Sequence, residues 1–200
     1  MINKSKSQIQ YIVVFYNILE GVFATIFGVV AQSIALIGFG FMSLIETVSN
    51  FITVRRLHKA LREKSFILGT TLNKPILSVA IVSFFGGSWV LIQSLKILIL
   101  KTPPLRSLVG IIIALCSLAL VPALTYWFYH NQDSTKTTIK MGFYNLWVYM
   151  FITVGLLFGL CLNYFFGFWK ADPIFGLIIS GFLYKKSFDS IISKEEKNND

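Results

Sequence analysis

The stretch Ser33-Ile34-Ala35-Leu36-Ile37-Gly38-Phe39-Gly40-Phe41-Met42-Ser43-Leu44-Ile45-Glu46 opens an apolar run that continues to Val54. A helix needs about 20 mostly apolar residues to cross a bilayer, so this run is long enough. Its one charged residue is Glu46. A charge near the bilayer centre costs roughly 3 kcal/mol on insertion scales. We therefore expect the Glu46 carboxylate to have a use that offsets this cost.

The composition is typical of a membrane protein. Hydrophobic residues make up 55% of the 200 residues and charged residues 14%, whereas soluble domains carry about 25% charged residues. We predict an all-α membrane protein in which residues 11–186 form one six-helix transmembrane domain. Residues 1–10 form a cytoplasmic N-terminus and residues 187–200 a short cytoplasmic tail.

Six segments are expected to span the bilayer. They cover residues 11–30, 34–54, 75–95 (with an apolar tail to Leu100), 108–129, 141–165, and a sixth that starts at Asp172-Pro173 and is clearly apolar only to Tyr184. A tight turn at Ala31-Gln32-Ser33 separates the first two. The sixth extends further if Lys185 and Lys186 reach toward the interface, and residues 187–192 then form an interfacial helical turn.

The basic residues predict the side on which each loop lies. With both termini in the cytoplasm, four of the 18 Lys and Arg residues lie outside, namely Lys96, Lys101, Arg106 and Lys170. Basic residues collect in cytoplasmic loops, so this arrangement is favoured, and we expect a multi-pass protein of the bacterial inner membrane. The net charge of +9 then reflects topology, and no basic patch interleaved with aromatic residues indicates nucleic-acid binding.

Two acids are expected at one depth in the membrane. Glu20 lies 12 residues before Gln32 and Glu46 lies 14 residues after it. In adjacent antiparallel helices their depths would differ by about 3 Å. The two carboxyl groups could share a proton or pair around a cation. Alternatively, each is a protonated acid that forms hydrogen bonds between helices.

Other polar residues recur at helical spacing, and soluble-enzyme signals are absent. The second span carries a stripe of Ser43, Glu46, Asn50 and Thr53, and the fifth carries Asn145, Tyr149 and Thr153 followed by the pair Gly155 and Gly159. Such stripes more often serve helix packing than an ion pathway.

Neither His58 nor His130 has a partner at metal-ligand spacing, and a histidine base inside the membrane is missing. We therefore expect neither an enzyme nor a resident cofactor. Cys116 and Cys161 fall within spans and do not suggest a disulfide.

From Gln32 to Glu46 the chain resembles the second helix of cation diffusion facilitators, the zinc-type cation efflux transporters. It is most similar to a short subgroup that lacks the cytoplasmic metal-binding domain and has the run Ser-x-Ala-Leu-x-Gly-Phe-Gly-x-Asp-Ser-Leu-Ile-Glu. The present chain matches this run except at Met42. Residues 159–163 and 167–173 resemble the end of the subgroup's fifth helix and the start of its sixth. The resemblance covers about residues 11–188 and implies a cation-efflux-like transmembrane bundle.

The resemblance also implies a four-ligand transport site with two ligands at i and i+4 on each of helices two and five. In this chain those positions are Met42 and Glu46, and by approximate alignment Asn145 and Tyr149. A thioether, an amide, a phenol and one carboxylate make a poor zinc site, because zinc is bound by Cys, His, Asp or Glu. Either the ion differs, or Glu20 supplies a second acid, or transport has been lost.

The resemblance thus implies a transporter of divalent cations in a lipid bilayer, with exchange for protons and assembly as a homodimer or hetero-oligomer. The alternative is a non-transporting member that serves as a scaffold or regulatory subunit of a membrane complex.

Overall fold

The computed structural model describes residues 4–63, 73–130 and 136–195, and the prediction of an all-α bundle with six helices is confirmed over them. The helices are α1 (Lys4–Ala31), α2 (Ile34–Glu63), α3 (Asn73–Leu100), α4 (Leu108–His130), α5 (Lys136–Phe166) and α6 (Ala171–Glu195). Most helices are longer than the apolar segments that predicted them, because polar residues extend their ends. Helix α4 runs through Pro122.

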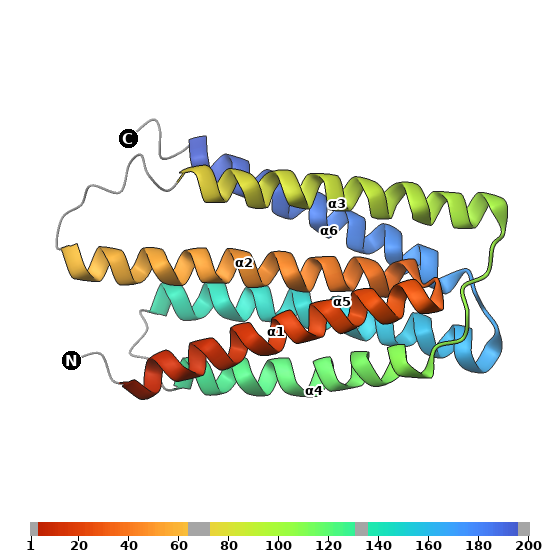
Figure 1. Cartoon of the computed structure of the whole chain (residues 1–200), viewed down its shortest axis with the longest axis horizontal. Helices are drawn as coiled ribbons and strands as arrows, with labels where there is room; N and C mark the ends of the chain where they lie inside the picture. Colours follow the sequence, from red (N-terminus) through yellow and green to blue (C-terminus); the bar gives the residue numbers. More distant parts are fainter. Residues whose placement is uncertain (1–3, 64–72, 131–135, 196–200) are drawn as a thin grey trace.

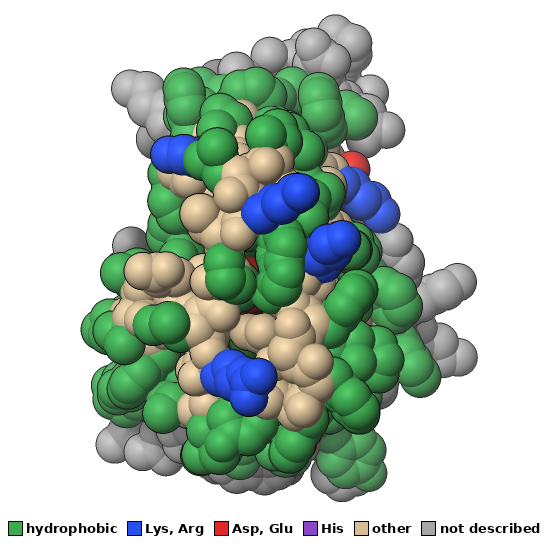
Figure 2. Space-filling model, turned by 90° about the vertical axis from the view of Figure 1, so that its right-hand side faces the viewer, with side chains coloured by type: hydrophobic (Ala, Val, Ile, Leu, Met, Phe, Trp, Pro, Cys, Tyr) green, Lys and Arg blue, Asp and Glu red, His purple; other side chains and the backbone are tan. Residues whose placement is uncertain are grey.

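The helices form two groups. Helices α1, α2, α4 and α5 pack together, and α3 pairs with α6 against α2 (Figure 1). Helix α1 begins and α6 ends at the same end of the bundle. We refer to this as the terminal end and to the other as the loop end, where the turns 32–33, 101–107 and 167–170 lie. Figure 2 shows the loop end, where Lys and Arg side chains are scattered among hydrophobic ones.

The predicted turn at Ala31-Gln32-Ser33 is present, and its backbone explains how tight it is. Gln32 has a φ of 53°, and the N–H groups of Ser33 and Gln32 donate to the carbonyl oxygens of Gly28 (2.9 Å) and Val29 (3.1 Å). This pair of bonds is the Schellman motif, which satisfies the last carbonyl groups of a helix. The next helix therefore starts at Ile34, two residues after Gln32.

The start of α2 is capped from α6. The Ser33 hydroxyl accepts a hydrogen bond from the Leu36 N–H (3.2 Å) and donates one to Asp172 Oδ1. The Ile34 N–H donates to Asp172 Oδ2 (2.9 Å). Asp172 is only 1% exposed, so a buried carboxylate on the first turn of α6 satisfies free donors at the first turn of α2. This contact fixes the register of α6 on α2 at the loop end.

Helix α6 extends well beyond the apolar segment that predicted it. Its helical structure continues past Tyr184 to Glu195, so residues 187–192 are helical as predicted and belong to the same helix. Two hydroxyl contacts hold this half against α3: Ser187 Oγ donates to the Ala80 carbonyl (2.8 Å), and the Tyr184 and Ser88 hydroxyls lie 2.8 Å apart. Hydropathy alone missed this continuation because these residues are polar but have partners on α3.

Small residues set the spacing between helices at two places. A Cβ added to Gly155 or Gly159 would lie 2.6 or 2.7 Å from the ring of Phe175, so the predicted glycine pair on α5 seats this α6 side chain. A Cβ added to Gly40 would lie 2.8 Å from the Gly21 carbonyl oxygen and 2.8 Å from the Thr25 nitrogen. The backbones of α1 and α2 are therefore in direct contact.

Replacing Gly40 with Ala is expected to destabilise the protein by about 1–3 kcal/mol, because the new methyl group meets backbone that cannot rotate away. Thermal unfolding of the purified protein in detergent measures the change. Gly181→Ala is the matched control, since a Cβ there meets nothing within 4 Å and an exposed helical glycine gains up to about 1 kcal/mol on replacement by alanine. Equal stability of the two variants would contradict the close approach of α1 and α2.

The outer surface fits a lipid environment. Large side chains such as Phe85 (68%), Trp147 (70%) and Phe151 (68%) are mostly exposed, and apolar surface of this extent is rare on soluble proteins. Among the residues that the structure describes, three helical segments are long and apolar enough to cross a membrane: Val14–Ala31, Leu77–Leu100 and Trp147–Phe166. The shorter apolar segments Ile34–Ser49 and Leu108–Ala123 belong to α2 and α4.

Candidate functional site

Glu20 lies inside the four-helix group, with 6% of its surface exposed. It sits on α1 and faces α2, where the Ser43 hydroxyl donates to Glu20 Oε2 at 2.7 Å. The same hydroxyl lies 3.3 Å from the Asn17 carbonyl oxygen, a longer and weaker contact. The Glu20–Ser43 bond forms because the two backbones approach closely at Gly21, next to Glu20, and Gly40, about one turn before Ser43.

Two further helices direct polar groups at Glu20. Ser117 of α4 and Tyr149 of α5 lie within interaction range of its carboxyl group, and both are buried. The Ser117 hydroxyl also donates to the Ile113 carbonyl (2.9 Å). Helices α1, α2, α4 and α5 thus all contribute polar groups, and Tyr16 of α1 lies within range of both Glu20 and Ser117. We name Glu20, Ser43, Ser117 and Tyr149 the Glu20 cluster.

Two atoms of the Glu20 cluster have no hydrogen-bond partner. They are Glu20 Oε1 and the Tyr149 hydroxyl oxygen, and the two side chains lie within interaction range of each other. Tyr149 is 5% exposed, and its ring packs on Phe39 with the centroids 5.6 Å apart. Leaving a buried polar group unpaired costs about 1–3 kcal/mol. Both atoms could accept a bond to a cation or take part in one with a proton, since each is buried and has an oxygen lone pair available.

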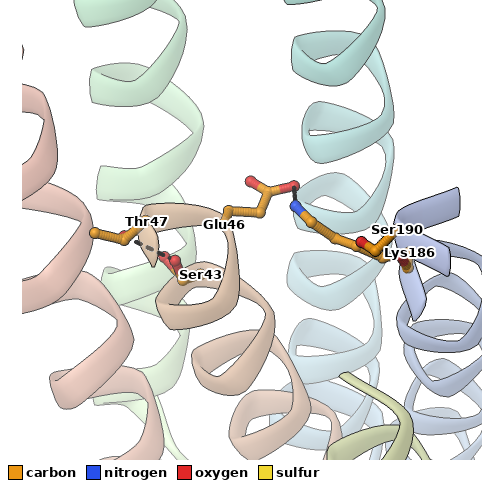
Figure 3. Close-up of polar contacts among 5 residues, drawn as sticks. All are labelled: Ser43, Glu46, Thr47, Lys186 and Ser190. Carbon is orange, nitrogen blue, oxygen red and sulfur yellow. Dashed lines mark hydrogen bonds and ion pairs between the residues drawn. The ribbon is translucent and has the colours of Figure 1, made fainter. Parts of the chain in front are cut away.

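Glu46 lies outside this cluster and forms an ion pair. Its Oε1 is 3.4 Å from Lys186 Nζ of α6, and the two side chains are 20% and 25% exposed. Figure 3 shows Glu46 extending from α2 toward Lys186, while Thr47 points to the opposite side. Glu46 is also close enough to Glu20 and Tyr149 to act on both through its charge. The acid in the second span therefore has a compensating charge.

The other residues of the expected metal site lie as follows. Met42, one turn before Glu46, is 4% exposed and belongs to the hydrophobic core with Phe39 and Tyr149. Asn145 is on α5, one turn before Tyr149, but its side chain lies outside the described residues, as do those of Asn50 and Thr53. The described residues contain no group of three or more His, Cys, Asp or Glu that could hold a metal. The four-ligand set stays a prediction.

The donor chemistry of the site is that of oxygen. Glu20, Ser43, Ser117, Tyr149 and Glu46 offer carboxylate, hydroxyl and phenol oxygens, and such ligands suit hard cations. Both cysteines are free thiols, with Cys116 exposed and Cys161 partly exposed, and neither belongs to the cluster. Groups of this chemistry can bind a proton or an oxygen-ligated cation.

Lys186 and Ser117 were not predicted as site residues. A depth count could have found Lys186: Glu46 lies 12 residues into α2 and Lys186 lies 15 residues into α6, and both helices start at the loop end. Their depths are then about 18 and 22 Å, close enough for a lysine side chain to bridge. No such signal marks Ser117, because a serine in an apolar span is usually satisfied by its own helix.

The chain matches a known protein family. A model described as the cation efflux transmembrane domain matches residues 11–194. The matched region includes all five candidate site residues, the Asp172 cap and Lys186. A search of curated proteins finds no match.

Proposed function

Because the chain belongs to the cation efflux family of membrane transporters, we propose that its cargo is a divalent cation held by oxygen ligands. Members of this family are transporters rather than enzymes. The observation that carries the proposal is the pair of buried, unpartnered oxygen atoms, Glu20 Oε1 and the Tyr149 hydroxyl, with Glu46 in charge range. A cation there would satisfy both oxygens.

The ligand types favour manganese-like ions over zinc. Zinc sites use thiolate, imidazole and carboxylate ligands, and a described cluster with carboxylate and hydroxyl groups resembles the oxygen-rich sites of harder ions. Glu20 takes the place of the second acid that the Met42 position does not supply. Exchange against protons is part of the proposal, because a carboxyl group that releases a cation within the membrane is stabilised by taking up a proton. The ion enters from the cytoplasmic side, on the terminal end.

A second candidate function is favoured by two observations. Lys186 already neutralises Glu46 (3.4 Å), and Met42 is a core residue. In this alternative the chain transports nothing and serves as a scaffold or regulatory subunit, as homodimer or hetero-oligomer, in a membrane complex of the bacterial inner membrane.

Flux in proteoliposomes separates these functions. The purified protein is reconstituted, and uptake of Mn²⁺, Zn²⁺, Co²⁺ and Cd²⁺ is followed with and without an imposed proton gradient. We expect saturable Mn²⁺ uptake that exceeds Zn²⁺ uptake and increases when protons can exchange. Empty liposomes and liposomes with denatured protein are the controls. Absence of flux for every ion would reject the transport proposal and favour the scaffold.

A further inference from the structure

The cation transport proposed above assigns no role to Lys186. It lies on α6, outside the four-helix group that holds the Glu20 cluster, and its ammonium group reaches across to Glu46 on α2. Long basic side chains near a helix end normally extend to the nearest membrane interface. The Lys186 side chain instead lies beside an acid at a similar depth, so it occupies a position that a cation could take (Figure 3).

Resting on the proposed function, we propose that Lys186 is a tethered cation that occupies Glu46 while the site is empty and is displaced when a transported cation loads. Once Glu20 has released its proton, Glu20 and Glu46 together carry two negative charges, and Lys186 supplies one positive charge. A divalent ion bound to both carboxylates is neutralised only if the ammonium group leaves. A surplus charge inside the membrane is costly, so binding of the ion and departure of Lys186 are coupled.

The Lys186 ammonium group can reach an alternative position at the membrane interface. At about 1.5 Å per residue it lies ~22 Å from the start of α6, and a hydrocarbon core is about 30 Å thick. The remaining ~8 Å to the far interface is close to the reach of an extended lysine side chain. The Lys186 side chain is 25% exposed, so part of its surface is not covered by other residues. Release from Glu46 therefore carries the ammonium group to the headgroups of the terminal end.

The displaced lysine also aids release of the ion. When it returns to Glu46 it competes with the bound cation for the same carboxylate oxygen. A site with this competitor binds more weakly and empties faster than a site without it. Lys186 is thus a positioning residue whose removal should change affinity and maximal flux in opposite senses.

The test uses equilibrium Mn²⁺ binding to the purified full chain in detergent together with Mn²⁺ flux in proteoliposomes. For Lys186→Gln we expect the dissociation constant and the flux KM to fall at least about tenfold and the maximal flux to fall several-fold, because release becomes slow. Lys186→Arg should behave as the wild type. Lys185→Gln is the matched control, being the adjacent, exposed lysine of the same helix. Lys186→Met, with an unbranched side chain, replaces Lys186→Gln if that variant is not monodisperse.

A double-mutant cycle locates the effect at Glu46. In the Glu46→Gln background, Lys186→Gln should change Mn²⁺ affinity by less than about twofold, since the competitor has lost its target. An undiminished effect there, or the same effect from Lys185→Gln, would overturn the tethered-cation role.

The outcomes for the two proposals can be told apart. Wild-type flux with unchanged KM and maximal flux in Lys186→Gln overturns the tethered cation alone. No wild-type flux, but tighter Mn²⁺ binding by Lys186→Gln, rejects transport and supports the tethered cation as a block on the site. No Mn²⁺ binding by either protein overturns both.

Discussion

Replacement of Glu20 by Gln is expected to reduce cation flux at least about 100-fold while leaving the protein folded. Glu20 is the buried acid with an unpartnered oxygen, and an amide in its place has no charge to offer a cation. The expected loss equals about 2.8 kcal/mol at 1.4 kcal/mol per tenfold. Initial rates of Mn²⁺ uptake in proteoliposomes measure it, and Asp189→Asn, at an exposed acid of α6, is the control.

Stability measurements show whether the loss of flux is local. The Gln amide keeps an oxygen that can accept from Ser43 and gains an N–H group that can donate to the Tyr149 hydroxyl. Glu20→Gln should therefore unfold at the wild-type temperature or above it. Flux near the wild-type rate in a well-folded Glu20→Gln variant would remove Glu20 from the transport site.

Tyr149 gives this argument an independent check. Its buried hydroxyl has no hydrogen-bond partner, so Tyr149→Phe should cost less than about 1 kcal/mol of stability and can even stabilise. If the hydroxyl is a cation ligand, the same variant should raise the KM for Mn²⁺ with little effect on folding. This combination distinguishes a ligand from a packing residue, because removing a satisfied packing hydroxyl would destabilise.

Much of the fold could be predicted from local sequence, whereas the site depended on contacts between helices. The turn at Gln32, the start of α2 at Ile34 and the number of helices follow from hydropathy and turn patterns. The ion-pair partner of Glu46 could not be predicted in this way, because Lys186 is 140 positions away in the sequence. Lys186 was expected at the membrane interface. The hydrogen bonds from the start of α2 to Asp172 of α6 were missed for the same reason. Glu20 was found, since its depth could be counted from the turn, but its Ser117 neighbour was not.

Replacement of Met42 by Asp is expected to make folding dependent on metal. Met42 lies one turn before Glu46 on the same face of α2 and is 4% exposed. Without metal, a carboxylate buried there lacks a partner and should lower stability by about 3 kcal/mol or more. With a divalent cation, the introduced carboxylate, Glu46 and Glu20 would provide three anionic ligands. A cation at 100 times its dissociation constant returns about 2.7 kcal/mol.

Thermal unfolding in detergent measures this dependence, with EDTA and with Mn²⁺ or Zn²⁺ in excess. The matched control is Met42→Asn, which places a polar group of similar size at the same point without charge. Metal should raise the unfolding temperature of Met42→Asp by several degrees more than that of Met42→Asn. Equal shifts in the two variants would show that position 42 does not face the cation, and the inference that Glu20 replaces the missing ligand would lose its basis. A large shift from a wild type that carries no flux would mark Met42 as the residue that disables the site.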